Sequence, residues 1–572
     1  MATLQRPPRR LIPGFVILAV STMLLVQLAR RSPVLLVAPP GTAARGAGAL
    51  VRNVAVRSAS TSSSPIVSAI PGITEKYKSL CDRLKEINQL SGAVAILGWD
   101  EQTMMPPGAA SSRGQQKAAL AAIIHEKQTD ENLASLIQEL QEGKHLNCEF
   151  ARANCRDAKR DYDLESSKSK EMAKLEAELE ADCFNTWVTA RKENDWKAME
   201  PKLKKMFDLK REIAKATRPD LPTYDGALDA FERGMPSSKL DSIFSQLKKD
   251  LVPLVKEVTS AKGYKIPPEL KDHDFDVKKQ AEMCIEIAKD IGFDISRGRF
   301  DVSAHPFTGG VGPSDVRITT RYSPKNWAEG LGGTIHEVGH ALYEQGRSME
   351  HQDLPVSRAL SMGVHESQSL LWERMVFQGR PFWDYATPII HKYFPHTKDI
   401  TADELYKAVN HVQPGLIRTE ADELTYPLHI MLRYNLEKSL MEDSVDVSCL
   451  PKIWNEDMKR SLGVSVPSDA DGVMQDVHWN VGAIGYFPSY TLGAMMAVQF
   501  YNEAKKQIPD LESKISKGEF GPLKDWLNQK VHQVGSLYAS PDELLIAVTG
   551  KPLDAGCFME YLQEKYSKLY SL

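Results

Sequence analysis

The chain has 572 residues, of which 42% are hydrophobic and 26% are charged. This composition is typical of a globular protein large enough to bury an extensive core. The formal net charge is −4, from 71 basic and 75 acidic residues, so no positive excess is available and the sequence argues against a nucleic-acid partner. Seven scattered cysteines without a CxxC pair predict reduced thiols.

Residues 1–74 differ from the rest of the chain, because they contain eight Arg but no Lys, Asp or Glu. Leu11–Ala29 is an uncharged stretch behind Arg9 and Arg10, long enough for a signal sequence or a membrane anchor. An acid-free segment rich in Arg, Ser and Ala follows, as in a transit peptide. We expect residues 1–74 to be a disordered bipartite leader that directs the protein to a plastid. Mitochondrial import and a type II membrane anchor are the alternatives.

Residues 75–572 are expected to form one domain around a groove, because no internal repeat or linker interrupts them. Without the leader's eight Arg, 63 basic residues face 75 acidic ones, a net charge of −12. Such a charge leaves no basic face for a membrane, so contact with one is expected only through an uncleaved leader. The stretch 157–215 mixes both signs of charge and is rich in helix formers, which predicts exposed helices.

A short strand is predicted at Asp315–Tyr322, DVRITTRY, because Arg317 and Arg321 alternate there with apolar residues and Thr. An edge strand beside a groove can bind an extended peptide, and Arg321 is then a candidate substrate contact. Simple hairpin pairing explains the pattern equally well.

The pentapeptide HEVGH, His336–His340, lies in a stretch with helical periodicity. Its apolar stripe consists of Trp327, Leu331, Ile335, Val338 and Leu342, and both histidines fall on the opposite side. Two histidines four residues apart on a helix can hold one metal ion, and the intervening Glu337 can act on a water molecule that the metal activates. The sequence therefore predicts a metal site at this helix.

A catalytic zinc site needs a third protein ligand, and Glu366 is the best candidate. It lies on a second predicted helix, well off the apolar stripe of Leu360, Val364, Leu371 and Met375. His365 and Glu373 are the competitors for the third ligand, and for Glu373 we expect a solvated position on the surface.

Several long motifs occur in a fixed order and carry a resemblance to a known family. They are His305–Phe307 (HPF), Asp315–Tyr322, HEVGH, Gly363–Ser369 (GVHESQS), Ile417–Tyr426 (IRTEADELTY) and His478–Gly493 (HWNVGAIGYFPSYTLG). Together with Leu97–Gln116 near the start, this set resembles the carboxypeptidase Taq family, the thermostable metallocarboxypeptidases. The resemblance covers roughly residues 75–572.

The resemblance implies a mainly α fold, in which a large helical metallopeptidase domain surrounds a deep active-site groove, with a small β-sheet beside the HExxH helix. It implies one zinc ion per subunit, with cobalt as the alternative, and commonly a homodimer. His336, His340 and Glu366 match the metal ligands, and Glu337 matches the general base. Arg418 matches the group that meets the substrate's C-terminal carboxylate, and His305 matches a further substrate contact. Three residues match the segment that lines the groove near the oxyanion: His478, Tyr486 and Tyr490.

The chemistry of these residue types agrees with peptide hydrolysis. An Arg fork can bind a terminal carboxylate with two hydrogen bonds, although Glu420, Asp422 and Glu423 offer Arg418 a purely structural ion pair. A Tyr hydroxyl or a His N–H beside the metal can stabilise the developing oxyanion. We therefore expect a metal-dependent carboxypeptidase acting on peptides. An oligopeptidase on the same fold and a non-catalytic binding protein that contains metal are the alternatives.

Overall fold

The computed structural model describes residues 73–142, 146–261 and 263–572. The predictions for the leader, including Leu11–Ala29, therefore lie outside the described residues, apart from its last two positions. Within the described ranges, no helix combines the length and the apolar character that a membrane crossing requires.

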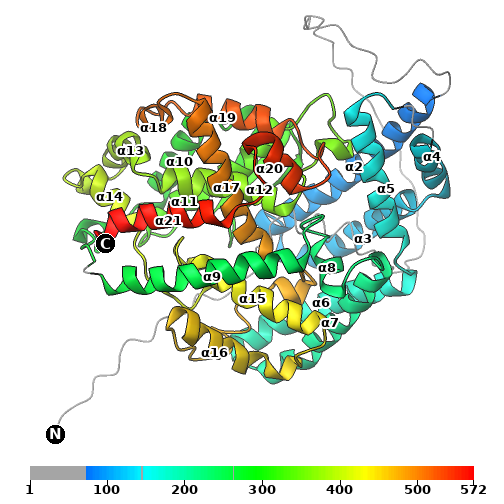
Figure 1. The fold of residues 1–572 in the computed structure, drawn as a ribbon, viewed down its shortest axis with the longest axis horizontal. Coiled ribbons are helices and arrows are strands. Elements are labelled where there is room, and N and C mark those ends of the chain that lie inside the picture. The colour runs from blue at the N-terminus through cyan, green and yellow to red at the C-terminus, as the bar shows by residue number, and fades with distance from the viewer. Residues whose placement is uncertain (1–72, 143–145, 262) are drawn as a thin grey trace, which may run out of the picture.

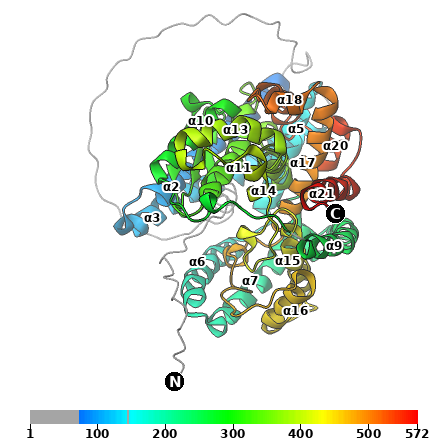
Figure 2. The same ribbon diagram turned by 90° about the vertical axis from the view of Figure 1, so that its left-hand side faces the viewer.

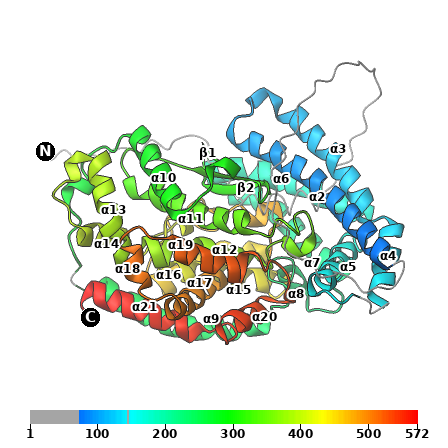
Figure 3. The ribbon, with the colours of Figure 1, turned by 90° about the horizontal axis from the view of Figure 1, so that it is seen from above.

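The first helices of the described chain pack around a small hydrophobic cluster of their own. They are α2 (Ile73–Thr103), α3 (Ala110–Gln128), α4 (Glu131–Glu142) and α5 (Glu149–Ser166). In Figure 3 they occupy one side of the molecule, beside the end of the sheet. Leu354, far along the chain, also belongs to this cluster and so joins these helices to the rest of the fold.

The charged stretch 157–215 is helical, as predicted, but it is not simply an exposed surface. It forms the end of α5, then α6 (Lys170–Glu193) and most of α7 (Trp196–Thr217), which lie at the lower edge of Figure 2. Glu176 is 1% exposed and pairs with Lys168 at 2.9 Å and with Lys210. The prediction of exposed helices is therefore wrong at these positions, where opposite charges are buried as pairs.

The β-sheet has three strands, β1 (Gly298–Val302), β2 (Phe307–Gly312) and β3 (Asp315–Thr320), in the order β1-β3-β2. β3 runs parallel to β1 and antiparallel to β2. The predicted strand DVRITTRY is thus the central strand, so the proposal that it offers a free edge is wrong. The two edge strands are β1 and β2.

Three helices from different parts of the chain form the centre of the main core. They are α11 (Trp327–Gly346), α12 (Met362–Leu370) and α17 (Pro488–Gln507). Asn326 and Ser361 cap the N-termini of α11 and α12 with their side chains, which fixes where each helix begins. The predicted apolar stripe of α11 is buried throughout. α12 continues directly into a π-helix, η5 (Leu371–Phe377).

The other helices surround this centre, and Figure 1 shows the last one, α21, lying beside α9. Their bounds are α8 (Thr223–Leu228), α9 (Ser237–Ser260), α10 (Val277–Ile291), α13 (Arg380–Tyr393), α14 (Ala402–Val409), α15 (Tyr426–Met441), α16 (Leu450–Leu462), α18 (Leu511–Ile515), α19 (Gly521–Leu527), α20 (Pro541–Thr549) and α21 (Ala555–Tyr570). Two short 3₁₀ turns, η7 (Arg418–Glu420) and η9 (His478–Val481), carry residues of the site. The fold is mainly helical with a small sheet beside α11, as predicted.

Candidate active site

The three predicted metal ligands come together between α11 and α12. His336, His340 and Glu366 each offer one ligand atom, and these atoms lie within 4.8 Å of one another. His340 Nε2 is 3.4 Å from Glu366 Oε2, and His336 Nε2 is 4.0 Å from Glu366 Oε1. One turn of α11 separates the two histidines, which is why their Nε2 atoms converge on the same carboxylate.

Two glycines allow α12 to bring Glu366 this close. A Cβ at Gly339, inside HEVGH, would lie 2.6 Å from the backbone of Gln368 on α12. On the opposite side, a Cβ at Gly493 on α17 would lie 2.8 Å from Cβ of Glu366. α12 therefore packs between α11 and α17 at two points where glycine provides no side chain, so the helices can approach closely.

Glu373 is not a solvated surface residue, so that prediction is wrong. Its Oε2 accepts a hydrogen bond of 2.6 Å from Nδ1 of His336. Burial lowers the pKa of His336, but the Glu373 hydrogen bond and the charges of Glu366 and Glu373 outweigh this and raise it to about 10. The contact fixes the ring of His336 so that Nε2 faces Glu366.

His365, a competitor for the third ligand, instead orients His340. Its Nε2 lies 3.0 Å from Glu344 Oε1, and its Nδ1 lies 2.6 Å from Nδ1 of His340. Because a carboxylate only accepts, Nε2 of His365 donates to Glu344, and in that tautomer Nδ1 of His365 accepts from Nδ1 of His340. This chain leaves the lone pair of His340 Nε2 directed at Glu366. Glu344 is in turn paired with Arg347.

Glu337 lies between the two histidines on α11 and contacts the sheet. It is 5% exposed, and its Oε2 accepts a hydrogen bond of 2.6 Å from the hydroxyl of Thr308 on β2. Burial raises the pKa of Glu337, and the charges of Glu366 and Glu373 raise it further. The charge of His336 and the hydrogen bond from Thr308 lower it, and the pKa is about 7. Sequence reasoning missed Thr308, although it directly follows the HPF motif.

Arg418 is buried, and its partner is none of the three neighbouring acids. Its Nε and Nη2 each lie 2.9 Å from Asp476 Oδ1, and its Nη1 donates to the hydroxyl of Tyr426 at 2.8 Å. Asp476 also pairs with Arg433, with 2.6 Å between Oδ2 and Nε. Two guanidinium groups thus share one carboxylate, which leaves net positive charge beside the site.

The three residues of the late His-Tyr segment lie together next to Arg418. His478 Nε2 is 3.1 Å from the hydroxyl of Tyr490, and the guanidinium carbon of Arg418 lies 4.9 Å from the centroid of the Tyr490 ring. Tyr486 packs edge-on against Tyr490, with 5.2 Å between ring centroids. Burial, then Arg418, lower the pKa of His478 to about 3, so its imidazole is neutral. Tyr490 lies one turn before Gly493 on α17, on the side that faces Glu366.

His305 and Arg321 lie at the end of the sheet. Burial lowers the pKa of His305 to about 4, and the nearby charges of Arg321 and Arg418 act in the same direction. Arg321 is exposed and is held by Glu329, with 2.7 Å between Nε and Oε1. The roles predicted for these two residues stay predictions.

A cavity of about 330 Å³ adjoins His340, one of the three proposed metal ligands. Its lining also includes His365 and the strand β2 from Thr308 to Gly312. In the described chain, β2 makes backbone hydrogen bonds to β3 alone, and α2 packs against this strand, with 5.0 Å between the ring centroids of Trp99 and Phe307.

The donor set fits a divalent transition metal. Two imidazole nitrogens and a carboxylate oxygen suit zinc and cobalt equally, and three protein ligands leave a coordination position open. Both imidazoles have an outer partner at Nδ1, as ligand histidines usually do. The negative field that raises the pKa of His336 also favours a bound cation.

Comparison with known proteins agrees with this geometry. The model of the carboxypeptidase Taq (M32) metallopeptidase family matches residues 79–566. Thermostable carboxypeptidase 1 of Thermus thermophilus is 37% identical over 506 residues, which cover 86% of this chain and 99% of the relative. Carboxypeptidase 1 of Bacillus subtilis is 36% identical, with the same coverage of both chains.

Solved structures give the same result. The crystal structure of the M32 carboxypeptidase from Deinococcus radiodurans R1 has a TM-score of 0.84 and 34% identity, covering 87% of this chain and 100% of that one. Metallocarboxypeptidase 1 of Trypanosoma cruzi has a TM-score of 0.82 and 34% identity, covering 86% and 99%. The chain therefore belongs to the carboxypeptidase Taq (M32) family of metallopeptidases and is an enzyme of the metallocarboxypeptidase class.

Proposed function

We propose that this enzyme releases the C-terminal residue of peptides, with Glu337 as the general base and Arg418 as the group that binds the terminal carboxylate. The observation that carries the proposal is the position of Glu337, which lies between the two histidines on α11 and is oriented by Thr308. The metal is proposed to be zinc, with cobalt as the alternative. When bound, it lowers the pKa of a water molecule and polarises the scissile carbonyl.

Glu337 can move the proton that this hydrolysis releases. Because Thr308 occupies Oε2, Oε1 of Glu337 is left to accept the proton from the attacking water and to pass it to the leaving amine. A pKa of about 7 suits a group that must both take up and release a proton near neutral pH. The hydroxyl of Tyr490, bonded to the neutral His478, is proposed to donate to the oxyanion.

The position of Arg418 supports removal of a terminal residue over internal cleavage. Asp476 has a second cation, Arg433, so binding of a substrate carboxylate at Arg418 does not leave Asp476 without a partner. We propose that the chain upstream of the scissile bond lies in the cavity along β2. The predictions of a homodimer and of plastid targeting by residues 1–74 rest on the family resemblance and on the sequence.

The test uses one free-acid peptide and its C-terminally amidated twin, with products identified by mass spectrometry. Stepwise loss of C-terminal residues from the free acid alone, abolished by chelator and restored by zinc or cobalt, supports the proposal. Internal cuts in both peptides would instead indicate the oligopeptidase. Glu337→Gln should abolish turnover and retain the bound metal, and hydrolysis by this variant would contradict the general-base assignment.

A further inference from the structure

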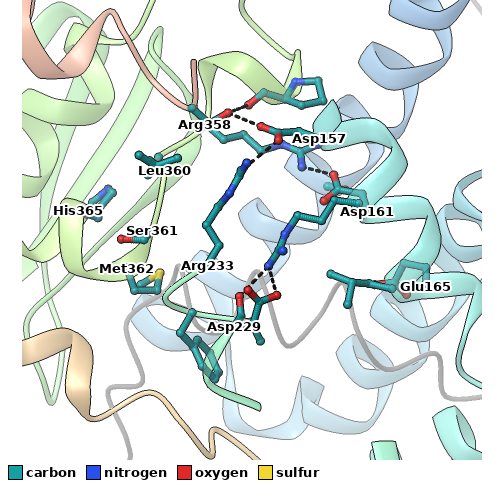
Figure 4. A pocket seen from close by; sticks show the side chains of 18 of the residues that line it. Asp157, Asp161, Glu165, Asp229, Arg233, Arg358, Leu360, Ser361, Met362 and His365 are labelled. Carbon is teal, nitrogen blue, oxygen red and sulfur yellow. Dashed lines mark hydrogen bonds and ion pairs between the residues drawn. The ribbon is translucent and has the colours of Figure 1, made fainter. Parts of the chain in front are cut away.

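Among the cationic side chains that line the cavity beside His340 is that of Arg233. Figure 4 shows it between the wall that carries Ser361, Met362 and His365 and the wall formed by α5. The Arg233 side chain is 12% exposed and comes from the loop between α8 and α9. Its position in the same cavity as His340 puts it within the space proposed for the upstream part of a peptide.

Among the residues that the structure describes, Asp157 is the one ion-pair partner of Arg233, and Asp157 also has a second cation, Arg156. Arg233 Nη1 lies 3.0 Å from Asp157 Oδ1. Asp157 receives two further hydrogen bonds from Arg156, of 2.7 and 3.1 Å, and one of 2.7 Å from Ser536. Arg156 does not line the cavity, and it is also held by the carbonyl of Leu537. Asp157 therefore keeps the cation of Arg156 when Arg233 binds another carboxylate.

Two other arginines that line the cavity, Arg358 and Arg160, are paired with carboxylates of their own. Arg358 pairs with Asp161, and Arg160 lies 2.8 Å from Asp229 Oδ2. Asp229 has a second arginine, Arg218, which lies outside the cavity. None of these acids is left over to balance Arg233.

Two other cations, Arg156 and Arg160, lie close enough to Arg233 to affect its pKa. Burial lowers the pKa of Arg233, and although Asp157 opposes this, the charges of Arg156 and Arg160 lower it further. Far below that pKa the group remains charged, so a carboxylate entering the cavity would meet a partly desolvated guanidinium.

We propose that Arg233 is a specificity-determining residue of this carboxypeptidase, which selects peptides with an acidic side chain upstream of the scissile bond. The inference rests on the proposed course of the substrate through the cavity. A peptide extended along β2 places alternate side chains on opposite sides, so the preference is expected at a defined position and not along the whole peptide. Glu165 on the α5 wall, 3.9 Å from His125, is the competing determinant, and it would favour a basic side chain.

The experiment is a positional scan with alanine peptides that share one C-terminal residue and carry a single Glu, Gln or Lys at one upstream position. For the wild-type enzyme, kcat/KM at one position should be about tenfold higher for Glu than for Gln, and lower for Lys. In Arg233→Met this Glu/Gln ratio should fall to about one, while the rate with the all-alanine peptide stays within about twofold. Arg233→Lys should restore part of the ratio, and raised salt should reduce it in the wild-type enzyme.

Arg218→Met is the matched control, because it also removes one of two arginines that share an aspartate, but outside the cavity. Its Glu/Gln ratio should equal that of the wild type. A ratio of one at every position in the wild type, a preference for Lys, or a full ratio in Arg233→Met would each overturn the inference. No release from the all-alanine peptide by the wild type would overturn the proposed function itself.

Discussion

The hydroxyl of Thr308 on β2 donates a 2.6 Å hydrogen bond to Oε2 of Glu337 on α11, which ties the proposed base to the sheet. Thr308→Val keeps the shape of the side chain but removes the donor. Because that hydrogen bond lowers the pKa of Glu337, its loss should raise the pKa. A base acts in its deprotonated form, so the acid limb of the kcat/KM profile should move to higher pH.

The same variant should lower kcat by about tenfold, because Glu337 loses its orientation. Full pH profiles of Thr308→Val and Thr308→Ser make the comparison. The serine variant retains a hydroxyl and should follow the wild-type profile. An unshifted acid limb in Thr308→Val would show that Thr308 does not act on the base.

Removing an outer partner of a metal ligand should weaken metal binding without removing the ligand. Glu373→Gln replaces the carboxylate that orients His336, and His365→Ala removes the ring that orients His340. Each should reduce metal affinity by about 10-fold to 100-fold. Competition with a chromophoric chelator measures this, and the exposed Glu420→Gln is the matched control. Wild-type affinity in both variants would assign these contacts to packing alone.

A methyl group at residue 493 should disturb the third ligand. In Gly493→Ala the added Cβ would lie 2.8 Å from Glu366 Cβ, so that side chain or its helix must shift. Metal affinity is expected to fall by about tenfold or more, since a displacement of a few tenths of an ångström is enough to misplace a ligand. Gly463→Ala offers a control glycine with open space around it, although its φ of +72° adds local strain. Unchanged metal binding in Gly493→Ala would contradict the proposed fit of α12 against α17.

Neutralising the buried Asp476 should lower the stability of the protein far more than neutralising an exposed aspartate. Asp476→Asn leaves Arg418 and Arg433 buried without a carboxylate between them. Breaking a buried ion pair from one side typically costs about 3–5 kcal/mol, so a large drop in Tm is expected. Asp443→Asn is the control, because Asp443 is 77% exposed and its ion pair with Arg211 should contribute little. Equal Tm values for the two variants would show that Asp476 does not stabilise the protein through Arg418 and Arg433.

The parts of the site that could be predicted are those encoded locally. Helical periodicity places His336 and His340 on one face and Glu366 off an apolar stripe, and the structure confirms both helices. The partners that tune these residues come from elsewhere in the chain. Thr308 lies on a strand before α11, and Asp476 lies 58 residues after Arg418. Their proximity depends on how the elements pack, which periodicity does not encode.

The position of Glu373 was partly predictable from its spacing in the sequence. Its spacing of seven from Glu366 puts both carboxylates on one helical face, so the pattern already favoured a place near the ligands. The prediction of a solvated position was wrong because it did not consider α11, whose His336 donates from Nδ1 to Glu373. The order of the strands failed for a related reason, since an alternating pattern does not distinguish a central strand from an edge.

The assignment of Arg418 predicts how the enzyme tells a free C-terminus from a blocked one. Arg418→Met leaves Asp476 paired with Arg433, so no buried charge is orphaned. Loss of a charge-assisted contact with the substrate should lower kcat/KM for a free-acid peptide by about 100-fold. The already slow rate for the amidated twin should be nearly unchanged. Arg433→Met is the counterpart, because it removes the other arginine and keeps Arg418, so it should lose stability while retaining the preference for the free acid. If the two variants discriminate equally well, the carboxylate is bound by a group other than Arg418.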